Sequence, residues 1–272
     1  MASMRIVRCK GNEGQIFTGC QFNKTTATVI RGDIFSGMEV TNQKVVVKEL
    51  LSPVNPAAIL CIGLNYKLHA AETGASLPDY PVLFMKNPGA VTGAGANIQI
   101  PVSCLEPLQV DYEAELAVII GKTAKNVKKE DALGYVLGYT CANDVSARIW
   151  QKHSGGKQWS RGKSFDTFCP LGPELVTADE IADPQKLSVE CRLNGKVMQH
   201  ASTSDMIFSV AEIIAFLSES TTLLPGTVIL TGTPNGVGFT RNPPVFLKPG
   251  DVLETEIEGV GMMSNPVVAE RI

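Results

Sequence analysis

The stretch DYEAELAVII, residues 111–120, joins two closely spaced glutamates to a continuous apolar run. Residues 116–120 are apolar at every position, which predicts a strand buried on both faces of a sheet. Because side chains two positions apart in a strand point to the same face, Glu113 and Glu115 should lie side by side. Two adjacent carboxylates at the end of a buried strand repel each other and lose hydration, so they require a nearby cation. The alternative is a solvated strand end that is simply acidic.

A third carboxylate follows the next strand signal. Residues 135–142 are typical of a strand, and they run into NDVSAR, residues 143–148, which places Asp144 at a strand end. There it could also serve as the N-cap of a helix. Three carboxylates without Cys or His nearby suit a hard cation such as Mg²⁺ or Mn²⁺. An octahedral ion with three protein ligands keeps positions for substrate and water, which indicates a catalytic arrangement.

The segment 67–109 is long, rich in Gly, Pro and Asn, and carries only one strand signal, at residues 82–85. Loops of this length are usually functional or mobile, so we expect residues 67–90 to form a lid. At its start, His69 and Glu72 are three positions apart and share one face of a helical turn. A carboxylate that binds one ring nitrogen leaves the other nitrogen to act as a base. A surface or packing histidine is the alternative.

Strand signals dominate the rest of the chain, and they predict a mainly β fold with a few short helices, of the α+β class. After Pro53 and Pro56 the sequence changes from short strand signals to a continuous apolar run at 57–62. We therefore expect a small N-terminal β domain at 1–54 and a catalytic domain at 55–272. We expect a hairpin turn at Asn194-Gly195. The expected strands are 4–9, 15–20, 26–31, 57–62, 112–120, 135–142, 187–193, 196–199, 227–231 and 252–257, and the expected helices begin near 146, 177 and 209.

Composition narrows the classes of partner. The 272 residues include 24 basic and 27 acidic side chains, a net charge of −3, which argues against nucleic-acid and anionic-membrane partners. Seven cysteines without a C-x-x-C pair indicate reduced, packed thiols rather than a zinc ribbon. Residues 220–240 are uncharged, but their glycines and prolines are incompatible with a membrane span. Without an apolar signal core near the N-terminus we expect a cytoplasmic protein, with a mitochondrial location as the alternative.

Several strings of the sequence resemble the fumarylacetoacetate hydrolase family. They fall in the family's order and cover roughly residues 57–272, and the stretch 156–173 is especially similar to a subgroup, the second type of fumarylacetoacetate hydrolase domain-containing protein. The strings are GLNYKLHAAE (63–72), DYEAELAVIIG (111–121), NDVSAR (143–148), GKSFDTFCPLGP (162–173), TGTPNGVG (231–238) and FLKPGD (246–251).

The resemblance implies a mixed β-roll or β-sandwich of long curved sheets, in a protein that is usually a homodimer. It implies that Glu113, Glu115 and Asp144 bind Mg²⁺, or Mn²⁺, and that Ca²⁺ can occupy the same site. It makes His69 and Glu72 the acid/base pair of a lid that becomes ordered when substrate binds. The other residues that it assigns are catalytic Lys163 and substrate-binding Gly63, Asn65, Tyr66, Gln151 and Thr233.

The chemistry that the resemblance implies is the binding of a small 2-oxo or 2,4-dioxo acid to Mg²⁺, which stabilises the enolate made beside it. Reprotonation gives keto–enol tautomerisation, attack by water gives C–C hydrolysis, and loss of CO₂ gives decarboxylation. Similarity to the second type favours an oxaloacetate tautomerase. An acylpyruvate or fumarylpyruvate hydrolase, a 2-oxo acid decarboxylase and a non-catalytic, metal-binding metabolite sensor are the alternatives. The family commonly has Asp after the S-A-R string, whereas Ile149 stands here, which puts the substrate range in question.

Overall fold

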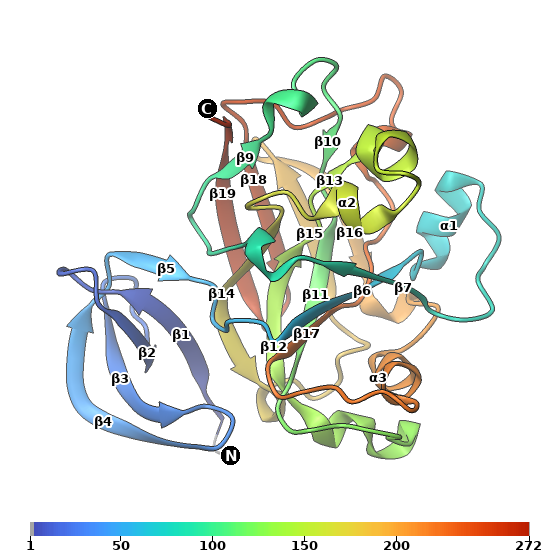
Figure 1. Ribbon diagram of the computed structural model, residues 1–272. Coiled ribbons are helices and arrows are strands. Elements are labelled where there is room, and N and C mark those ends of the chain that lie inside the picture. The colour runs from blue at the N-terminus through green and yellow to red at the C-terminus, as the bar shows by residue number, and fades with distance from the viewer. Residues whose placement is uncertain (1–2, 272) are drawn as a thin grey trace.

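The computed structural model describes residues 3–271, and strands dominate it (Figure 1). Within these residues the larger sheet has twelve strands, with the path β4-β3-β2-β1-β14-β12-β11-β17-β6-β7, while β5 pairs with β1 and β8 with β14. Its strands are β1 (Arg5–Lys10), β2 (Ile16–Cys20), β3 (Thr26–Asp33), β4 (Gly37–Val46), β5 (Glu49–Leu51), β6 (Ala58–Gly63), β7 (Val82–Lys86), β8 (Val91–Thr92), β11 (Ala114–Ile120), β12 (Val136–Asn143), β14 (Cys169–Thr177) and β17 (Thr227–Leu230).

A second sheet, in the order β16-β15-β18-β19-β9, packs against β11, β12 and β14 of the first. A short third ladder joins β10 to β13. The mainly β prediction is therefore confirmed. The strands of these two sheets are β9 (Ile98–Ile100), β10 (Val110–Asp111), β13 (Ser146–Ala147), β15 (Ser188–Leu193), β16 (Lys196–Ser202), β18 (Val252–Ile257) and β19 (Gly261–Ala269).

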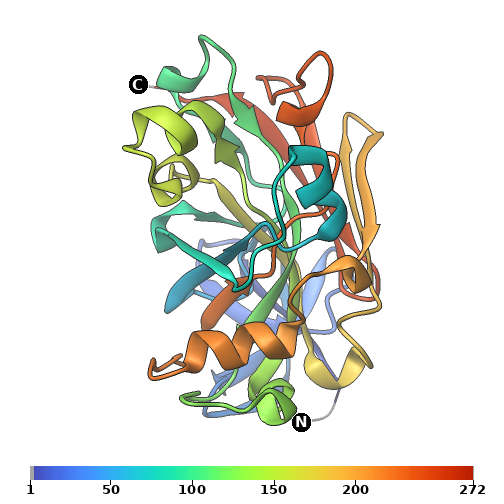
Figure 2. The same cartoon turned by 90° about the vertical axis from the view of Figure 1, so that its right-hand side faces the viewer.

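The helices are short and lie around the sheets (Figure 2). None of those in residues 3–271 has the length and apolar character that crossing a membrane requires. The α-helices are α1 (Lys67–Thr73), α2 (Trp159–Lys163) and α3 (Val210–Ser218). A π-helical turn covers Trp150–Ser154, and 3₁₀ turns cover Pro88–Ala90, Val102–Cys104, Lys129–Tyr135, Ala178–Glu180, Thr203–Asp205 and Gly238–Thr240.

The apolar run at residues 116–120 lies between the two buried cores and contributes side chains to each. In β11 the side chains of Leu116 and Val118 belong to one buried cluster, whereas Ala117 and Ile119 belong to another on the opposite face. Every residue of β11 is buried. Burial of β11 on both faces therefore explains its continuous apolar sequence, because such a strand has no face that contacts water. All seven cysteines are likewise buried and unpaired.

The first five strands lie to one side of the rest of the molecule (Figure 1) and join it through the larger sheet. β1 pairs antiparallel with β14, with Arg5 opposite Val176 and Ile6 opposite Leu175. The backbone N–H of Met4 also donates to the Thr177 hydroxyl. The expected domain boundary near residue 54 stays a prediction.

Strand pairing brings the chain segments of the site to one edge of the larger sheet. β11 and β12 are antiparallel, with Ala114 opposite Asn143. The residue before the first of these, Glu113, therefore lies next to the residue after the second, Asp144, whose N–H donates to the Glu113 carbonyl at 2.8 Å. β17 is antiparallel to β11 and parallel to β6, so the loops that follow β17 and β6 emerge at the same edge.

Two expectations for segments near this edge need correction. Residues 67–109 are not one loop, since they contain α1, β7, β8 and β9; the short lengths of these elements explain why their periodicity was weak. The helix expected from residue 146 instead begins as strand β13 and becomes a π-helical turn at Trp150. Strands β4, β14 and β19 were not predicted, and the last two contain prolines that usually mark turns.

Helix α3 begins with the capping box that the sequence predicts. Ser209 accepts from the Glu212 N–H at 3.3 Å, and the Glu212 carboxylate accepts from the Ser209 N–H at 2.8 Å. Lys129 also donates to this carboxylate at 2.7 Å. The hydrogen bonds from Lys129 and Ser209 lower the pKa of Glu212 to about 2. These contacts join α3 to the 3₁₀ turn at Lys129–Tyr135.

We expect the stabilisation by Glu212 to depend on pH. Its folded pKa lies below the ordinary value of 4.5, so its contribution is complete above pH 4.5 and is lost as the pH falls toward 2. In urea unfolding, Glu212→Gln should lower the free energy of unfolding at pH 7, by about 1 kcal/mol at most, as for other cap residues. The difference from wild type should shrink as the pH falls below 4.5. A difference that is constant with pH, or equal to that of exposed Glu39→Gln, would contradict the assignment.

Candidate metal centre and active site

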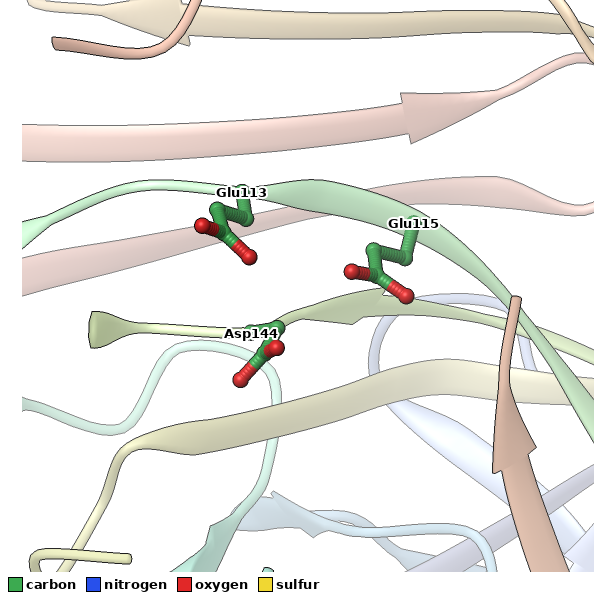
Figure 3. Close-up of side chains that lie close together, drawn as sticks. All are labelled: Glu113, Glu115 and Asp144. Atoms are coloured by element: carbon green, nitrogen blue, oxygen red, sulfur yellow. The ribbon is translucent and has the colours of Figure 1, made fainter. Parts of the chain in front are cut away.

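Three carboxylates converge at the edge where β11 begins and β12 ends. Glu113 and Glu115 project from the same side of β11, and Asp144 lies beside them on the neighbouring segment (Figure 3). One oxygen of each side chain lies within 4.8 Å of the others, and all three side chains are buried. A compact, buried set of oxygen donors without sulfur or imidazole suits a hard divalent cation. The triad that the sequence predicts can therefore hold a metal ion.

Two buried lysines compensate part of this negative charge. Lys163, at the end of α2, donates to Glu113 at 2.8 Å, to Asp144 at 2.6 Å and to the Ser146 hydroxyl at 2.7 Å. All three ammonium protons are thereby used. Lys86, at the end of β7, donates to the other oxygen of Asp144 and to the Val145 carbonyl. The carboxylates draw protons to the site, so the pKa of Lys163 is raised despite its burial.

The triad is electrically uneven. Burial alone would raise the pKa of Glu113, but Lys163 and Arg148 outweigh it and lower that pKa to about 2. Glu115 forms no ion pair with a basic side chain in residues 3–271 and accepts only from the Gly232 N–H, at 2.6 Å. Burial, with repulsion from Asp144 and Glu113, raises the pKa of Glu115 well above its ordinary value. The side of the triad at Glu115 is therefore where a further positive charge is most favourable.

Arg148 and Asp111 form a second buried ion pair directly beside the triad. Arg148 contacts Asp111 through Nε at 2.9 Å and Nη2 at 2.8 Å, and its Nη1 lies 2.6 Å from Glu113. Asp111 also accepts the backbone N–H groups of Gly238 at 2.7 Å and Phe239 at 3.0 Å. Asp111 thus ties one metal-ligand candidate to the loop at residues 236–240.

The pair His69 and Glu72 lies on α1, whose last turn is bonded to this same loop through Glu72. His69 Nδ1 lies 2.7 Å from Glu72 Oε1, and because a carboxylate only accepts, Nδ1 carries the proton and Nε2 stays a base. Glu72 also accepts from the Gly236 N–H at 2.9 Å and the Thr240 hydroxyl at 3.2 Å. Burial would raise the pKa of Glu72, but the bonds from His69 and Gly236 lower it overall.

A cavity of about 220 Å³ brings these groups together. Its volume suits a small organic acid rather than a polymer. Gln151, which lines it, accepts from Arg148 at 3.1 Å, and the Thr233 hydroxyl donates to the Ala114 carbonyl at 3.0 Å. The residues expected for the site that line the cavity are Gly63, His69, Glu113, Glu115, Asp144, Gln151, Lys163 and Thr233.

Of the other expected residues, Glu72 supports His69 without lining the cavity itself, and Asn65 and Tyr66 do not line it either. The Asn65 amide donates to the carbonyls of Phe208 and Thr231, at 3.0 and 2.7 Å, so it joins two loops. Tyr66 is fully buried, and within residues 3–271 its hydroxyl has no hydrogen-bond partner. Their part in substrate binding stays a prediction.

Sequence reasoning missed several residues of the site. Asp111 precedes Glu113 by two positions. The two-residue period that places Glu113 and Glu115 on one face could therefore have placed Asp111 on that face as well. Lys86 shares the buried face of β7 with Phe84. A lysine at a buried position of an alternating strand could have indicated a buried anionic partner for Lys86. Lys152 and Phe239, which also line the cavity, carried no local signal.

A buried oxygen-donor centre and an acid/base pair that share one small cavity define an enzyme site for a small molecule. Comparison with known proteins agrees, because the family model "Fumarylacetoacetate (FAA) hydrolase C-terminal" matches residues 58–268. The chain belongs to the fumarylacetoacetate hydrolase family, as its sequence predicts, and it is an enzyme of that family.

The chain is similar to curated proteins and to solved structures over most of its length. It is 52% identical over 220 residues to "Oxaloacetate tautomerase fahd2, mitochondrial" of Xenopus laevis, covering 80% of this chain and 68% of that protein. It is 48% identical over 219 residues to the human "Oxaloacetate tautomerase FAHD2A, mitochondrial", covering 80% and 69%. The structure of fumarylacetoacetate hydrolase from Exiguobacterium antarcticum is 36% identical with a TM-score of 0.86, covering 98% of this chain and all of that one.

We expect Glu115→Gln to abolish metal binding while the fold persists. Loss of a residue that merely orients a metal ligand typically costs about 10- to 100-fold in affinity, so loss of a ligand charge should cost at least about 100-fold. Because the amide also removes an unmatched buried charge, the melting temperature without metal should rise slightly. Isothermal titration with Mg²⁺ or Mn²⁺ and thermal unfolding measure the two effects. Exposed Glu39→Gln is the control, and undiminished affinity in Glu115→Gln would exclude the residue as a ligand.

Proposed function

We propose that the protein is a metal-dependent enzyme for small 2-oxo acids and that its main activity is keto–enol tautomerisation of oxaloacetate. The observation that carries the proposal is the sharing of one cavity by the carboxylate triad and His69. The names of the frog and human relatives, both oxaloacetate tautomerases, support the same substrate.

The triad fits the role of a metal centre. A divalent ion held by Glu113, Glu115 and Asp144, Mg²⁺ or Mn²⁺ by preference, supplies a Lewis acid for the oxygens of a 2-oxo acid when it is bound. Lys163 offsets the charge of two of the ligands through its bonds to Glu113 and Asp144. Its part in catalysis is therefore compensation of negative charge at the centre, which keeps the buried carboxylates ionised.

His69 and Glu72 provide the proton transfer. Tautomerisation moves one proton between a carbon and an oxygen of the same molecule, so a single acid/base group suffices. His69 takes the proton at Nε2, while Glu72 holds the Nδ1–H and fixes both the tautomer and the ring orientation. Gln151 offers an amide group from the cavity wall for the substrate carboxylate, and Thr233 can donate to it once its hydroxyl releases the Ala114 carbonyl.

A second candidate is hydrolysis of a C–C bond in an acylpyruvate or fumarylpyruvate. The likeness to a structure named fumarylacetoacetate hydrolase favours it. Hydrolysis also requires an activated water, and the described lining of the cavity holds one histidine to serve both acid and base roles. We prefer tautomerisation because it requires one acid/base group and no activated water.

A substrate panel tests the proposal. Enol oxaloacetate absorbs ultraviolet light more strongly than the keto form, so its decay with Mg²⁺ reports tautomerisation, while acetylpyruvate and fumarylpyruvate report hydrolysis. We expect tautomerisation to be faster than either hydrolysis. His69→Ala should lower turnover by about 10²- to 10⁴-fold, the usual scale for a positioned general base, and leave Mg²⁺ affinity intact.

The control for this variant is His200→Ala, because His200 is 63% exposed on its side chain and lies on β16, away from the cavity. Its turnover should equal that of wild type. Full turnover of His69→Ala on every accepted substrate would reduce the pair to a structural role. Hydrolysis without tautomerisation would instead favour the second candidate.

We also propose a homodimer that uses the exposed apolar side chains of β7. β7 ends the strand path beside α2, whose Ser160 hydroxyl accepts from the Met85 N–H at 3.3 Å, and the Leu83 and Met85 side chains are each 48% exposed, which is unfavourable in a monomer. Light scattering at micromolar concentration should give twice the chain mass of 29.1 kDa. The double variant Leu83→Lys/Met85→Lys should give the single mass, and a monomeric wild type would contradict the proposal.

The names of the frog and human relatives place those proteins in mitochondria. For this chain a mitochondrial or a cytoplasmic location is a proposal that cell fractionation can test.

A further inference from the structure

The cavity wall contains three basic side chains that differ in how they are engaged. Arg148 is paired with Asp111 and Glu113, and Lys163 uses its three protons on acceptors around the triad. Lys152 also lines the cavity but forms no ion pair with a carboxylate in residues 3–271. Its side chain is exposed, so its ammonium group is available to a ligand at the mouth of the cavity.

Lys152 is nevertheless held in place. Its Nζ lies 4.2 Å from the centroid of the Phe239 ring, and the Arg148 guanidinium lies 4.4 Å from the same centroid. Such cation–π contacts hold a cation over the face of an aromatic ring. The backbone that carries the ring is held in turn, because the Phe239 N–H donates to Asp111 at 3.0 Å. The ammonium is therefore positioned at the wall by an element that is anchored to the buried ion pair.

The surroundings of Lys152 favour an anion. The Arg148 guanidinium faces the same Phe239 ring as the Lys152 ammonium, and partial burial followed by the charge of Arg148 lowers the pKa of Lys152. Gln151, its neighbour in the π-helical turn, also lines the cavity and adds an amide. A 2-oxo acid whose carboxylate and keto oxygens lie at the triad extends the rest of its chain into this same cavity.

We propose that Lys152 determines specificity by binding the distal carboxylate of a dicarboxylic 2-oxo acid. The inference rests on the proposed function and deepens it, because it selects dicarboxylic acids such as oxaloacetate over 2-oxo acids with a neutral tail. A neutral tail leaves the Lys152 ammonium to solvent, whereas a carboxylate gains a charge-assisted hydrogen bond.

The test compares two acids that differ in one group. Oxaloacetate and 2-oxobutyrate both have four carbons, but a methyl group in the second replaces the distal carboxylate of the first. Their affinities are measured by calorimetry with Mg²⁺ for wild type, Lys152→Met and Lys152→Arg, and the KM for enol oxaloacetate is measured alongside. Lys125→Met serves as the control, because Lys125 is exposed and does not line the cavity.

We expect Lys152→Met to weaken oxaloacetate binding by about fivefold to tenfold, the scale of an ion pair that is partly open to solvent. The KM should rise by a similar factor with little change in kcat, 2-oxobutyrate binding should be unchanged, and Lys152→Arg should restore most of the affinity. If Lys152→Met weakens the binding of both acids equally, or changes the affinity for oxaloacetate by less than twofold, the assignment of Lys152 is overturned while the proposed function stands. A wild type that binds neither acid in the presence of Mg²⁺ would overturn the proposed function and this assignment together.

Discussion

The antiparallel register of β11 and β12 is the constraint on which the site depends. By setting Ala114 opposite Asn143, it brings together Glu113 and Asp144, which are thirty-one positions apart in the sequence, and leaves Glu115 two residues along on the same face. The resulting negative charge is buried between two apolar cores, where it is costly unless cations match it. Lys86, Lys163 and Arg148 match much of it, and the remaining imbalance falls on Glu115. The strand pairing thus creates a set of oxygen donors that can hold a metal ion.

The loop after β17 connects this centre to the acid/base pair. Asp111 accepts two of its backbone N–H groups, and Glu72 accepts the N–H of Gly236. The glycines of this loop are required by close approach: a Cβ on Gly238 would lie 1.8 Å from the Val245 carbonyl oxygen. At Gly236 the left-handed φ of +100° adds a conformational reason. A change at either position should therefore disturb α1 and the triad together, because both are bonded to the same short backbone segment.

The sequence predicted the parts of this arrangement that follow from local periodicity. Alternation within residues 111–120 predicted the two glutamates on one face, and the strand end before Asp144 predicted the third ligand. Proline and glycine concealed β14 and β19, whose strand character comes from neighbours in the sheet rather than from their own residues. Lys152 and Phe239 are eighty-seven positions apart, and only the fold brings them to one wall. The amide of Asn65, which the family resemblance assigns to substrate binding, also joins two loops, and only the fold reveals this structural role.

We propose that Glu113, Glu115 and Asp144 hold one divalent ion at the cavity that also contains His69. Crystals grown with Mn²⁺ can locate this ion in an anomalous difference map, since Mn²⁺ accepts the same oxygen ligands as Mg²⁺ and has its own anomalous scattering. We expect a single strong peak coordinated by one oxygen of each carboxylate, with an open side toward the cavity. A peak elsewhere, or none among the three carboxylates at saturating Mn²⁺, would contradict the proposal.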